Sequence, residues 1–279
     1  MSKEDLTFKA CDRMVRDFED VIKKPVREPS SVYYTGVDLG TACVVLAVLD
    51  EHLRPVAGTF RYADVVRDGM VVDYIGAIRI VREMKEELEE KLGSQLIYAA
   101  AAIPPGTDAL DSGAIKNVVQ GAGFEITALP DEPTAANAVL NIRNGAVVDI
   151  GGGTTGISVL KDGNVVYVAD EPTGGTHFSL VIAGAYKMSF ADAEIYKRDK
   201  KNHKELLPVL KPVIEKVSSI ISRHIEGREV DGIYLVGGTC CLTGIEGIIE
   251  KKTGIPTYKP GNPMFVTPRG IARNCTAQA

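Results

Sequence analysis

The chain has 279 residues, of which 45% are hydrophobic and 25% charged, and its formal net charge is −5 at pH 7. This is the composition of an ordinary globular protein, and the length suffices for one large core or two modest ones. The negative charge argues against nucleic acid as a partner, because nucleic-acid-binding proteins need a basic face.

Five cysteines and four histidines bear on redox state and metal binding. The cysteines form no C-x-x-C pair, which predicts a reduced, cytoplasmic protein, and the adjacent Cys240 and Cys241 are expected to fill buried positions. The scattered histidines lack the spacing of a metal site. Because the chain starts with no signal peptide and no apolar run reaches membrane length, we expect no membrane association.

The first segment, residues 5–24, has the pattern of an amphipathic helix. The polar stretch that follows it, up to residue 30, contains two prolines and predicts a linker. Two interpretations remain open: the helix packs on its own domain, or residues 6–22 dock a partner. The apolar positions of the helix fall on one face: Leu6, Ala10, Met14, Phe18 and Ile22, with Cys11, Val15 and Val21 beside them.

Two segments, residues 36–58 and 147–169, show the same order of features. Each predicts an apolar strand, an aspartate, a glycine–threonine turn, a second strand, an acidic hairpin turn and a third strand. Asp38 in the first segment corresponds to Asp149 in the second. The repetition predicts two similar halves.

The loop of the second repeat contains three consecutive glycines at 151–153 and the spacing G-x-G-x-x-G, which also marks dinucleotide-binding loops. A dinucleotide site requires a helix after the glycines, whereas residues 155–168 predict two strands, so the NAD-binding interpretation is rejected. A plain structural turn would not need three glycines. Their backbone amides can bind an anion, and Asp149 would repel phosphate unless a cation lay between them. With Thr154 and Thr155 alongside, the pattern indicates magnesium and phosphate.

The remaining chain alternates helices and strands, which predicts an α/β fold. Pro208 and Pro212 are expected to keep the start of the long helix over 203–227 irregular. A turn at Gly237 and Gly238 is expected to precede a helix from about residue 242. Further helices are expected at 75–92, 107–123, 131–141, 174–187 and 189–200, and further strands at 96–105, 124–130 and 231–236.

Together these residues resemble the actin-like ATPase superfamily, which includes actin, DnaK-type chaperones, FtsA and sugar kinases. The resemblance covers roughly residues 31–279, and the segments 62–78 and 174–198 look closest to the FtsA and MreB branch. Five segments carry it in order: "GVDLGT" and "VVDIGGGTT" as the two phosphate loops, "DEPTAANA" and "TPRGIARNC" as the two connecting helices, and "IYLVGGTCCLTGIEGII" as the adenosine loop.

The resemblance implies two ribonuclease-H-like domains with a nucleotide cleft between them. Short segments after each phosphate loop imply that both outer subdomains are reduced. We expect three parts: an N-terminal helix and linker at 1–30, domain I at 31–145 plus 262–279, and domain II at 146–261.

The resemblance also assigns roles to residues, with ATP or ADP and Mg2+ as ligands. Asp38 and Asp149 would hold the Mg2+, mostly through water, and Glu132 would position the attacking water. Glu194 and Lys197 match an E-x-x-K pattern that contacts ribose and base, although the same residues fit a solvated helical salt bridge. The other expected nucleotide contacts are Gly40, Thr41, Gly151, Gly152, Gly153, Thr154, Thr155, Gly174, Gly175, Gly237, Gly238 and Thr239.

The resemblance extends to proteins of ethanolamine-utilisation operons and their bacterial microcompartments. It implies an ATP-dependent chaperone-like or assembly factor, with microcompartment shell proteins or pathway enzymes as partners. Hydrolysis is expected to be slow, because no lysine matches the phosphate-contacting lysine of the chaperones and only Arg61 and Arg67 occur nearby. Two alternatives stay open: a self-associating scaffold or filament that uses ATP structurally, and a small-molecule kinase, which the reduced outer subdomains disfavour.

Overall fold

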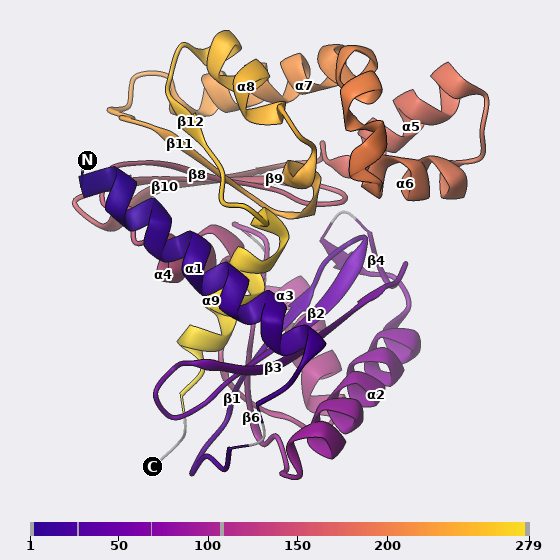
Figure 1. Ribbon diagram of the computed structural model, residues 1–279, viewed down its shortest axis with the longest axis vertical. Coiled ribbons are helices and arrows are strands. Elements are labelled where there is room, and N and C mark those ends of the chain that lie inside the picture. The colour runs from indigo at the N-terminus through magenta and orange to yellow at the C-terminus, as the bar shows by residue number, and fades with distance from the viewer. Residues whose placement is uncertain (1–2, 27, 68, 107–108, 277–279) are drawn as a thin grey trace. The chain divides into compact units, whose positions relative to one another are not determined.

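The computed structural model describes residues 3–26, 28–67, 69–106 and 109–276, with the side chains of 3–8 and 109–111 left out (Figure 1). The chain divides into two compact units. Unit 1 comprises Met1–Asn141 and Phe265–Ala279, and unit 2 comprises Ile142–Met264. The expected α/β class with two similar halves is confirmed, since each unit contains a five-stranded sheet among its described residues.

The sheet of unit 1 has the strand order β3-β2-β1-β6-β7. Its first three strands are antiparallel, and the last two run parallel to β1. A short hairpin of β4 and β5 follows β3. The bounds are β1 Tyr34–Leu39, β2 Cys43–Leu49, β3 Pro55–Tyr62, β4 Val66–Arg67, β5 Met70–Val71, β6 Tyr98–Ala101 and β7 Glu125–Ala128.

Helices cover both faces of this sheet, and the alanines of β6 show how. Ala99 and Ala101 belong to the core under α2 and α3, whereas Ala100 packs with the residues of α4 and α9. Alternation in a strand places neighbouring side chains on opposite faces, so small residues let two helical layers approach. The helices are α2 Tyr74–Leu92, α3 Ala109–Gly121, α4 Glu132–Leu140 and α9 Val266–Asn274.

Unit 2 repeats this plan, with the strand order β10-β9-β8-β11-β12. Asp162 and Gly163 form the predicted hairpin turn, with positive φ values of 55° and 84° that suit these two residues. Helices α5, α7 and α8 contribute to the core on one face of the sheet. The bounds are β8 Gly145–Ile150, β9 Thr155–Lys161, β10 Asn164–Glu171, α5 Gly175–Tyr186, α6 Phe190–Arg198, α7 His203–Ile225, β11 Ile233–Val236, α8 Ile245–Thr253 and β12 Thr257–Tyr258.

Two expectations about unit 2 are corrected. α7 is a continuous helix through Pro208 and Pro212 rather than irregular at its start. A proline inside a helix costs about 3 kcal/mol, and burial of one large apolar side chain contributes about 1.5–3 kcal/mol. The eight buried apolar side chains of α7 therefore outweigh the two prolines. The helix expected from residue 242 begins only at Ile245, because a 3-10 turn over Gly238–Cys241 comes first.

The N-terminal helix α1, Lys3–Lys23, packs on unit 1, which is one of the two interpretations left open by the sequence. Its buried line runs through Cys11, Val15 and Phe18, whereas Ala10 is exposed and the Leu6 side chain lies outside the described residues. The Phe18 ring meets Phe265 edge-on with centroids 5.4 Å apart.

Gly58 in β3 explains why Phe18 fits so closely. A Cβ atom at Gly58 would lie 2.6 Å from Cζ of the Phe18 ring, so the aromatic ring rests directly on the strand backbone. The Arg269 side chain of α9 is only 4% exposed and donates a hydrogen bond to the Met14 carbonyl of α1. An apolar contact and a buried polar contact thus hold the same helix.

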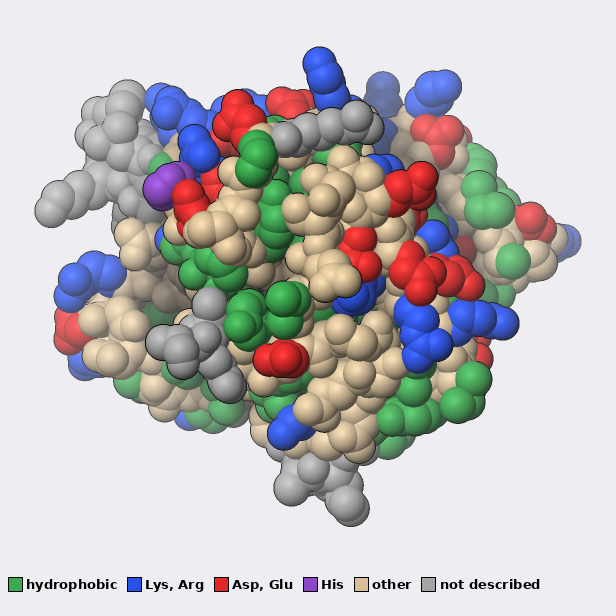
Figure 2. All heavy atoms as spheres, turned by 90° about the horizontal axis from the view of Figure 1, so that it is seen from below, with side chains coloured by type: hydrophobic (Ala, Val, Ile, Leu, Met, Phe, Trp, Pro, Cys, Tyr) green, Lys and Arg blue, Asp and Glu red, His purple; other side chains and the backbone are tan. Residues whose placement is uncertain are grey.

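The surface carries mixed charge. On the face shown in Figure 2, acidic and basic side chains are interspersed rather than gathered by sign. Within the described residues, no helix is both long and apolar enough to cross a membrane.

Replacing Phe18 with alanine tests the docking of α1. Phe18→Ala removes a fully buried ring, and we expect it to lower the free energy of unfolding by about 3–5 kcal/mol. Arg16→Ala, on the exposed side of the same helix, is the control and should change it by less than about 0.5 kcal/mol. Urea denaturation measures both. Equal small effects would mean that α1 is not packed in solution.

Candidate functional site

The glycine loop of unit 2 joins β8 to β9 and is closed on itself. Gly151 donates its backbone N–H to the Thr154 carbonyl at 3.0 Å. The start of α5 then binds the loop, because Gly175 and Thr176 donate to the carbonyls of Gly151 and Gly152 at 2.9 and 2.7 Å. The strand–loop–strand order confirms that this glycine motif does not open a helix, as a dinucleotide-binding loop would.

Gly174 and Gly175 pack against this loop backbone to backbone. A Cβ atom at Gly174 would lie 2.7 Å from the Gly153 carbonyl carbon and 2.8 Å from the Thr154 nitrogen. A Cβ atom at Gly175 would collide with the Thr239 hydroxyl and lie 3.2 Å from Lys197 Nζ. Only glycine leaves room for this approach.

The loop after β11 completes the cluster in unit 2. Gly237 has a φ of 91°, and a Cβ atom there would collide with Asp149 Oδ1 and lie 2.6 Å from the Ile150 carbonyl oxygen. Thr239 donates its hydroxyl to the Gly151 carbonyl at 2.7 Å. Gly238 has open space where a Cβ would be. The predicted residues Asp149, Gly151, Gly174, Gly175, Gly237 and Thr239 are therefore brought together within this unit.

The hydroxyls of the two loop threonines are used within the protein. Thr155 is fully buried and donates to the Thr173 carbonyl at 2.6 Å, which ties the start of β9 to the segment before Gly174. The Thr154 side chain is hydrogen-bonded to the carboxyl of Asp170. Asp170, the partner of Thr154, is a residue that the sequence analysis missed.

Glu194 and Lys197 do not form a solvated salt bridge. Their side chains are only 15% and 14% exposed, with Lys197 Nζ 2.7 Å from Glu194 Oε1. Lys197 also donates to Ser179 Oγ at 2.7 Å and to the Gly175 carbonyl at 2.9 Å. Burial lowers the pKa of Lys197, and the carboxylate of Glu194 opposes that effect. The pair therefore anchors the first turn of α5 beside the glycine loop.

In unit 1, the first predicted phosphate loop lies between β1 and β2. Gly40 donates its N–H to the Cys43 carbonyl at 3.1 Å, and a Cβ atom there would lie 2.9 Å from the same oxygen. Asp38, at the end of β1, is half-buried, and Thr41 lies in the turn. Arg61 and Arg67, the two arginines considered from the sequence, form their ion pairs elsewhere in unit 1.

Those ion pairs are formed with carboxylates of unit 1. Arg61 pairs with Glu83 at 2.7 Å and with Glu87 at 3.1 Å. Arg67 is exposed and lies 3.4 Å from Asp64. Both guanidinium groups therefore already have anionic partners.

Glu132 begins α4, and the neighbouring Asp131 caps that helix. Asp131 accepts hydrogen bonds from the Thr134 backbone at 2.9 Å and from its hydroxyl at 2.7 Å. Pro133 follows in the first turn, as expected. Capping is thus performed by Asp131, and Glu132 is not needed for it.

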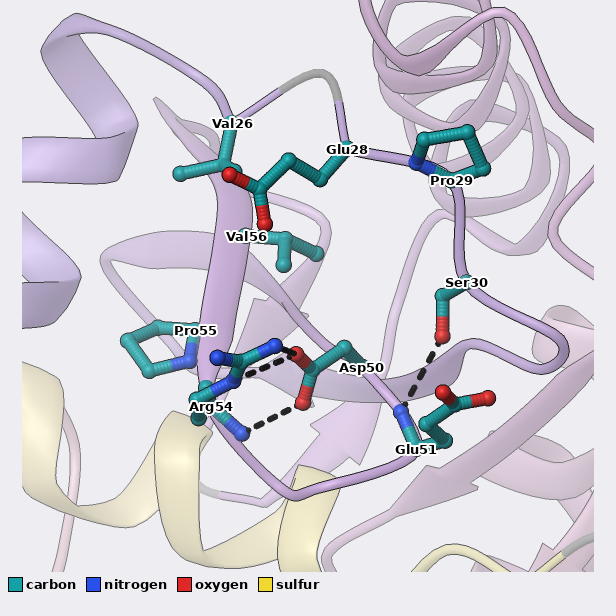
Figure 3. A pocket seen from close by; sticks show the side chains of 9 residues that line it. All are labelled: Val26, Glu28, Pro29, Ser30, Asp50, Glu51, Arg54, Pro55 and Val56. Atoms are coloured by element: carbon teal, nitrogen blue, oxygen red, sulfur yellow. Dashed lines mark hydrogen bonds and ion pairs between the residues drawn. The ribbon is translucent and has the colours of Figure 1, made fainter.

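A small hollow of about 170 Å³ in unit 1 contains none of the predicted site residues (Figure 3). It lies between the linker after α1 and the β2–β3 turn. Arg54 donates Nε to Asp50 Oδ2 at 2.8 Å, and the Glu51 N–H donates to Ser30 Oγ at 3.1 Å. The first bond closes the turn and the second ties the linker to it, which gives the hollow a structural explanation.

Asp170 in β10 was missed by the sequence analysis. Its carboxyl is largely buried, and burial raises its pKa to about 6, with the charge of Asp149 adding to the effect. One signal could have found it, namely its position at the end of the third strand of the second repeat, close to Gly174 in the sequence.

Comparison with known proteins places the chain in a family. The ethanolamine utilization protein EutJ of Salmonella typhimurium is 44% identical over 247 residues, which cover 88% of this chain and 87% of that protein. The crystal structure of EutJ from Carboxydothermus hydrogenoformans has a TM-score of 0.90 and 47% identity, covering 96% of this chain and 99% of its own.

More distant matches share the fold. The family model for the type IV pilus assembly protein PilM matches residues 125–269, and the model for the MreB/Mbl protein matches residues 55–191. The crystal structure of MreB5 of Spiroplasma citri bound to AMPPNP has a TM-score of 0.70 at 18% identity, over 87% of this chain and 95% of its own. The same values hold for its structure bound to ADP.

Two glycines of α5 test the close packing at the glycine loop. Gly175→Ala should lower the free energy of unfolding by about 1–3 kcal/mol, because the new methyl group forces Thr239 and Lys197 away. Gly184→Ala, in the same helix but with open space at its Cβ, should raise it by roughly 0.5–1 kcal/mol. Both are measured by urea denaturation. Equal stabilities of the two variants would contradict the packing.

Proposed function

The chain belongs to the EutJ family of ethanolamine utilization proteins, which has the actin-like ATPase fold, and on that premise we propose that it binds ATP as a chaperone-like or assembly factor in microcompartment formation. The observation that carries the proposal is the convergence of three backbone segments in unit 2. Residues 151–154, 174–175 and 237–239 approach one another so closely that Gly174, Gly175 and Gly237 have no room for a side chain. Exposed backbone amides at such a cluster bind phosphate.

The residues present fit a nucleotide with Mg2+. Gly238 has open space where a Cβ would be, and the buried Asp149 lies beside Gly237. Asp170 Oδ1 is buried without a hydrogen-bond partner among the described residues. That part of the chain contains no group of three or more acids, histidines or cysteines that could hold a metal directly. Magnesium keeps most of its water and takes oxygen ligands from phosphate, so two carboxylates suffice.

In this proposal each residue has a defined task. Within unit 2, Asp149 holds the water shell of the cation, and the backbone N–H groups of Gly152 and Gly153 donate hydrogen bonds to phosphate. Within unit 1, Asp38 and Thr41 are assigned the same two tasks. The N–H groups of Gly40 and Gly151 close their own loops instead. The bound cation neutralises phosphate charge. The glycines at 174–175 and 237–238, with Thr239, leave room for the nucleoside, and Glu194 and Lys197 place the first turn of α5 against it. The MreB5 structures bound to AMPPNP and ADP support a nucleotide as the ligand of this fold.

Hydrolysis is assigned to Glu132 and is slow. Asp131 rather than Glu132 caps α4, and we assign the Glu132 carboxylate, at the start of that helix, to the orientation of a water molecule. Arg61 and Arg67 are held by carboxylates of unit 1, so neither supplies the positive charge that would speed phosphoryl transfer.

The proposed partners are microcompartment shell proteins or enzymes of the ethanolamine pathway, and the proposed location is the cytoplasm with its microcompartments. Between Cys11 and Val21, the buried apolar line of α1 is already used by unit 1. A partner at α1 therefore contacts its exposed side, which carries Arg13, Arg16, Asp17 and Asp20.

A scaffold that uses ATP structurally is the second candidate. Large apolar side chains are exposed around the β4–β5 hairpin, among them Met70, Val72 and Ile75, the last 73% exposed. Exposed apolar groups in one region are typical of protein–protein contacts. Self-association that requires ATP but not its turnover would favour this candidate.

Nucleotide should protect the protein against heat. With Mg-ADP at about a hundred times its Kd, the folded state gains roughly 2.7 kcal/mol. Asp149→Asn should lose most of the Mg2+-dependent part of this gain, whereas Asp231→Asn, at an exposed position of unit 2, should keep it. Differential scanning fluorimetry with and without EDTA measures the effect. An unchanged melting temperature of the unaltered protein would reject nucleotide binding.

Glu132→Gln separates binding from chemistry. We expect phosphate release to fall by on the order of 10²-fold, because the amide orients water less well, while ADP binding changes little. Asp131→Asn is the neighbouring control, since asparagine caps a helix about as well as aspartate. Equal turnover in Glu132→Gln and unaltered protein would contradict the assignment. Absence of turnover in the unaltered protein would favour the scaffold.

A further inference from the structure

A row of three paired residues crosses the sheet of unit 2 and carries two carboxylates. Asp149 of β8 pairs with Gly156 of β9, and Gly156 pairs in turn with Asp170 of β10. Residues paired directly across strands point to the same face of a sheet. Gly156 has no side chain, so the middle strand puts nothing between the two acids. The strands that flank β9 are about 10 Å apart, a span that two carboxylates and a hydrated ion can fill.

This face lies opposite the helical core of unit 2. The alternate residues Val148, Ile157 and Tyr167 pack with the core that contains α7 and α8. Asp149, Gly156 and Asp170 therefore point away from those helices. Asp149 is at the same time next to Gly237 and the glycine loop, which connects the row to the proposed phosphate site.

The same row in unit 1 has a different chemistry. There Asp38 pairs with Val45, and Val45 pairs with Phe60. Phe60 packs against Phe265 with ring centroids 5.8 Å apart. Since the same sheet position accepts an aromatic residue in one unit, the strand order does not require an acid there. The second carboxylate is a property of unit 2 alone among the two described rows.

Asp170 is poorly satisfied by the protein. Its Oδ1 atom is buried and has no hydrogen-bond partner in the described part of the chain, and the carboxyl is otherwise hydrogen-bonded to Thr154. Burial, together with the nearby charge of Asp149, raises its pKa to about 6. A largely buried carboxylate with one unsatisfied oxygen, near a second carboxylate, destabilises the protein when no cation is bound. A cation between them would remove that penalty.

We propose that Asp170 is a positioning residue for the divalent cation of the bound nucleotide, holding the cation's water shell together with Asp149 beside the glycine loop. The inference rests on the proposed nucleotide binding and adds a residue to it. Binding through water agrees with the reluctance of magnesium to lose its hydration. The competing explanation is structural, in which Asp170 serves only to hold the Thr154 side chain.

The affinity for Mn2+ in the presence of ADP distinguishes these explanations. The probe is Mn2+ titrated into full-length protein with ADP, with free Mn2+ read by electron paramagnetic resonance. Asp170→Asn should weaken Mn2+ binding roughly ten- to a hundredfold, the range for residues that act on a metal through its ligands. ADP binding in EDTA should not change. Asp162→Asn is the matched control in the same hairpin, exposed and at a φ that asparagine accepts, and should behave like the unaltered protein.

The two explanations predict opposite changes in the melting temperature when no metal is bound. If Asp170 faces Asp149 to hold a cation, Asp170→Asn removes a buried charge and should raise the melting temperature in EDTA. A purely structural role predicts a lower melting temperature and unchanged Mn2+ affinity, and that result would overturn the inference. If the unaltered protein binds ADP with Mn2+ and Asp170→Asn binds Mn2+ equally well, the inference alone is overturned. Failure of the unaltered protein to bind ADP overturns the proposed function and this inference together.

Discussion

The contact of backbone with backbone at the glycine loop of unit 2 is the constraint on which the candidate site depends. Gly174 approaches the carbonyl carbon of Gly153 to within a distance that no side chain would permit, and Gly237 does the same at Ile150. Three segments distant in sequence can meet only because these residues lack a Cβ. The resulting cluster of peptide groups and the buried Asp149 provide the polar surroundings that phosphate and a hydrated cation require.

Internal duplication explains both the fold and its asymmetry. The two sheets have the same strand order, so each places an aspartate at the end of its first strand, Asp38 or Asp149. The neighbouring positions then diverge: unit 1 fills the end of the row with Phe60, and unit 2 with Asp170. In unit 1 this position contributes to apolar packing, and in unit 2 it carries a charge. The side chains, rather than the topology, therefore distinguish the two rows.

Much of the fold could be predicted from local patterns. The Asp162–Gly163 turn follows from two residues that accept positive φ, and the α4 cap follows from Asp131 before Pro133. α7 could not be read in this way, because two prolines argue against a regular helix and the burial that outweighs them is tertiary. The same holds for α8, whose start is delayed by a 3-10 turn fitted between Gly237 and Leu242.

The sequence by itself determined the repeat, the strand–loop–strand character of the glycine motif and most of the glycines at the site, because these depend on backbone conformation over a few residues. The tertiary structure decided which distant side chains share a face. It buried the Glu194–Lys197 pair under α5, packed α1 on β3 through Phe18, and set Asp170 in register with Gly156 and Asp149. Strand register and helix docking arise from long-range packing, which no local pattern encodes.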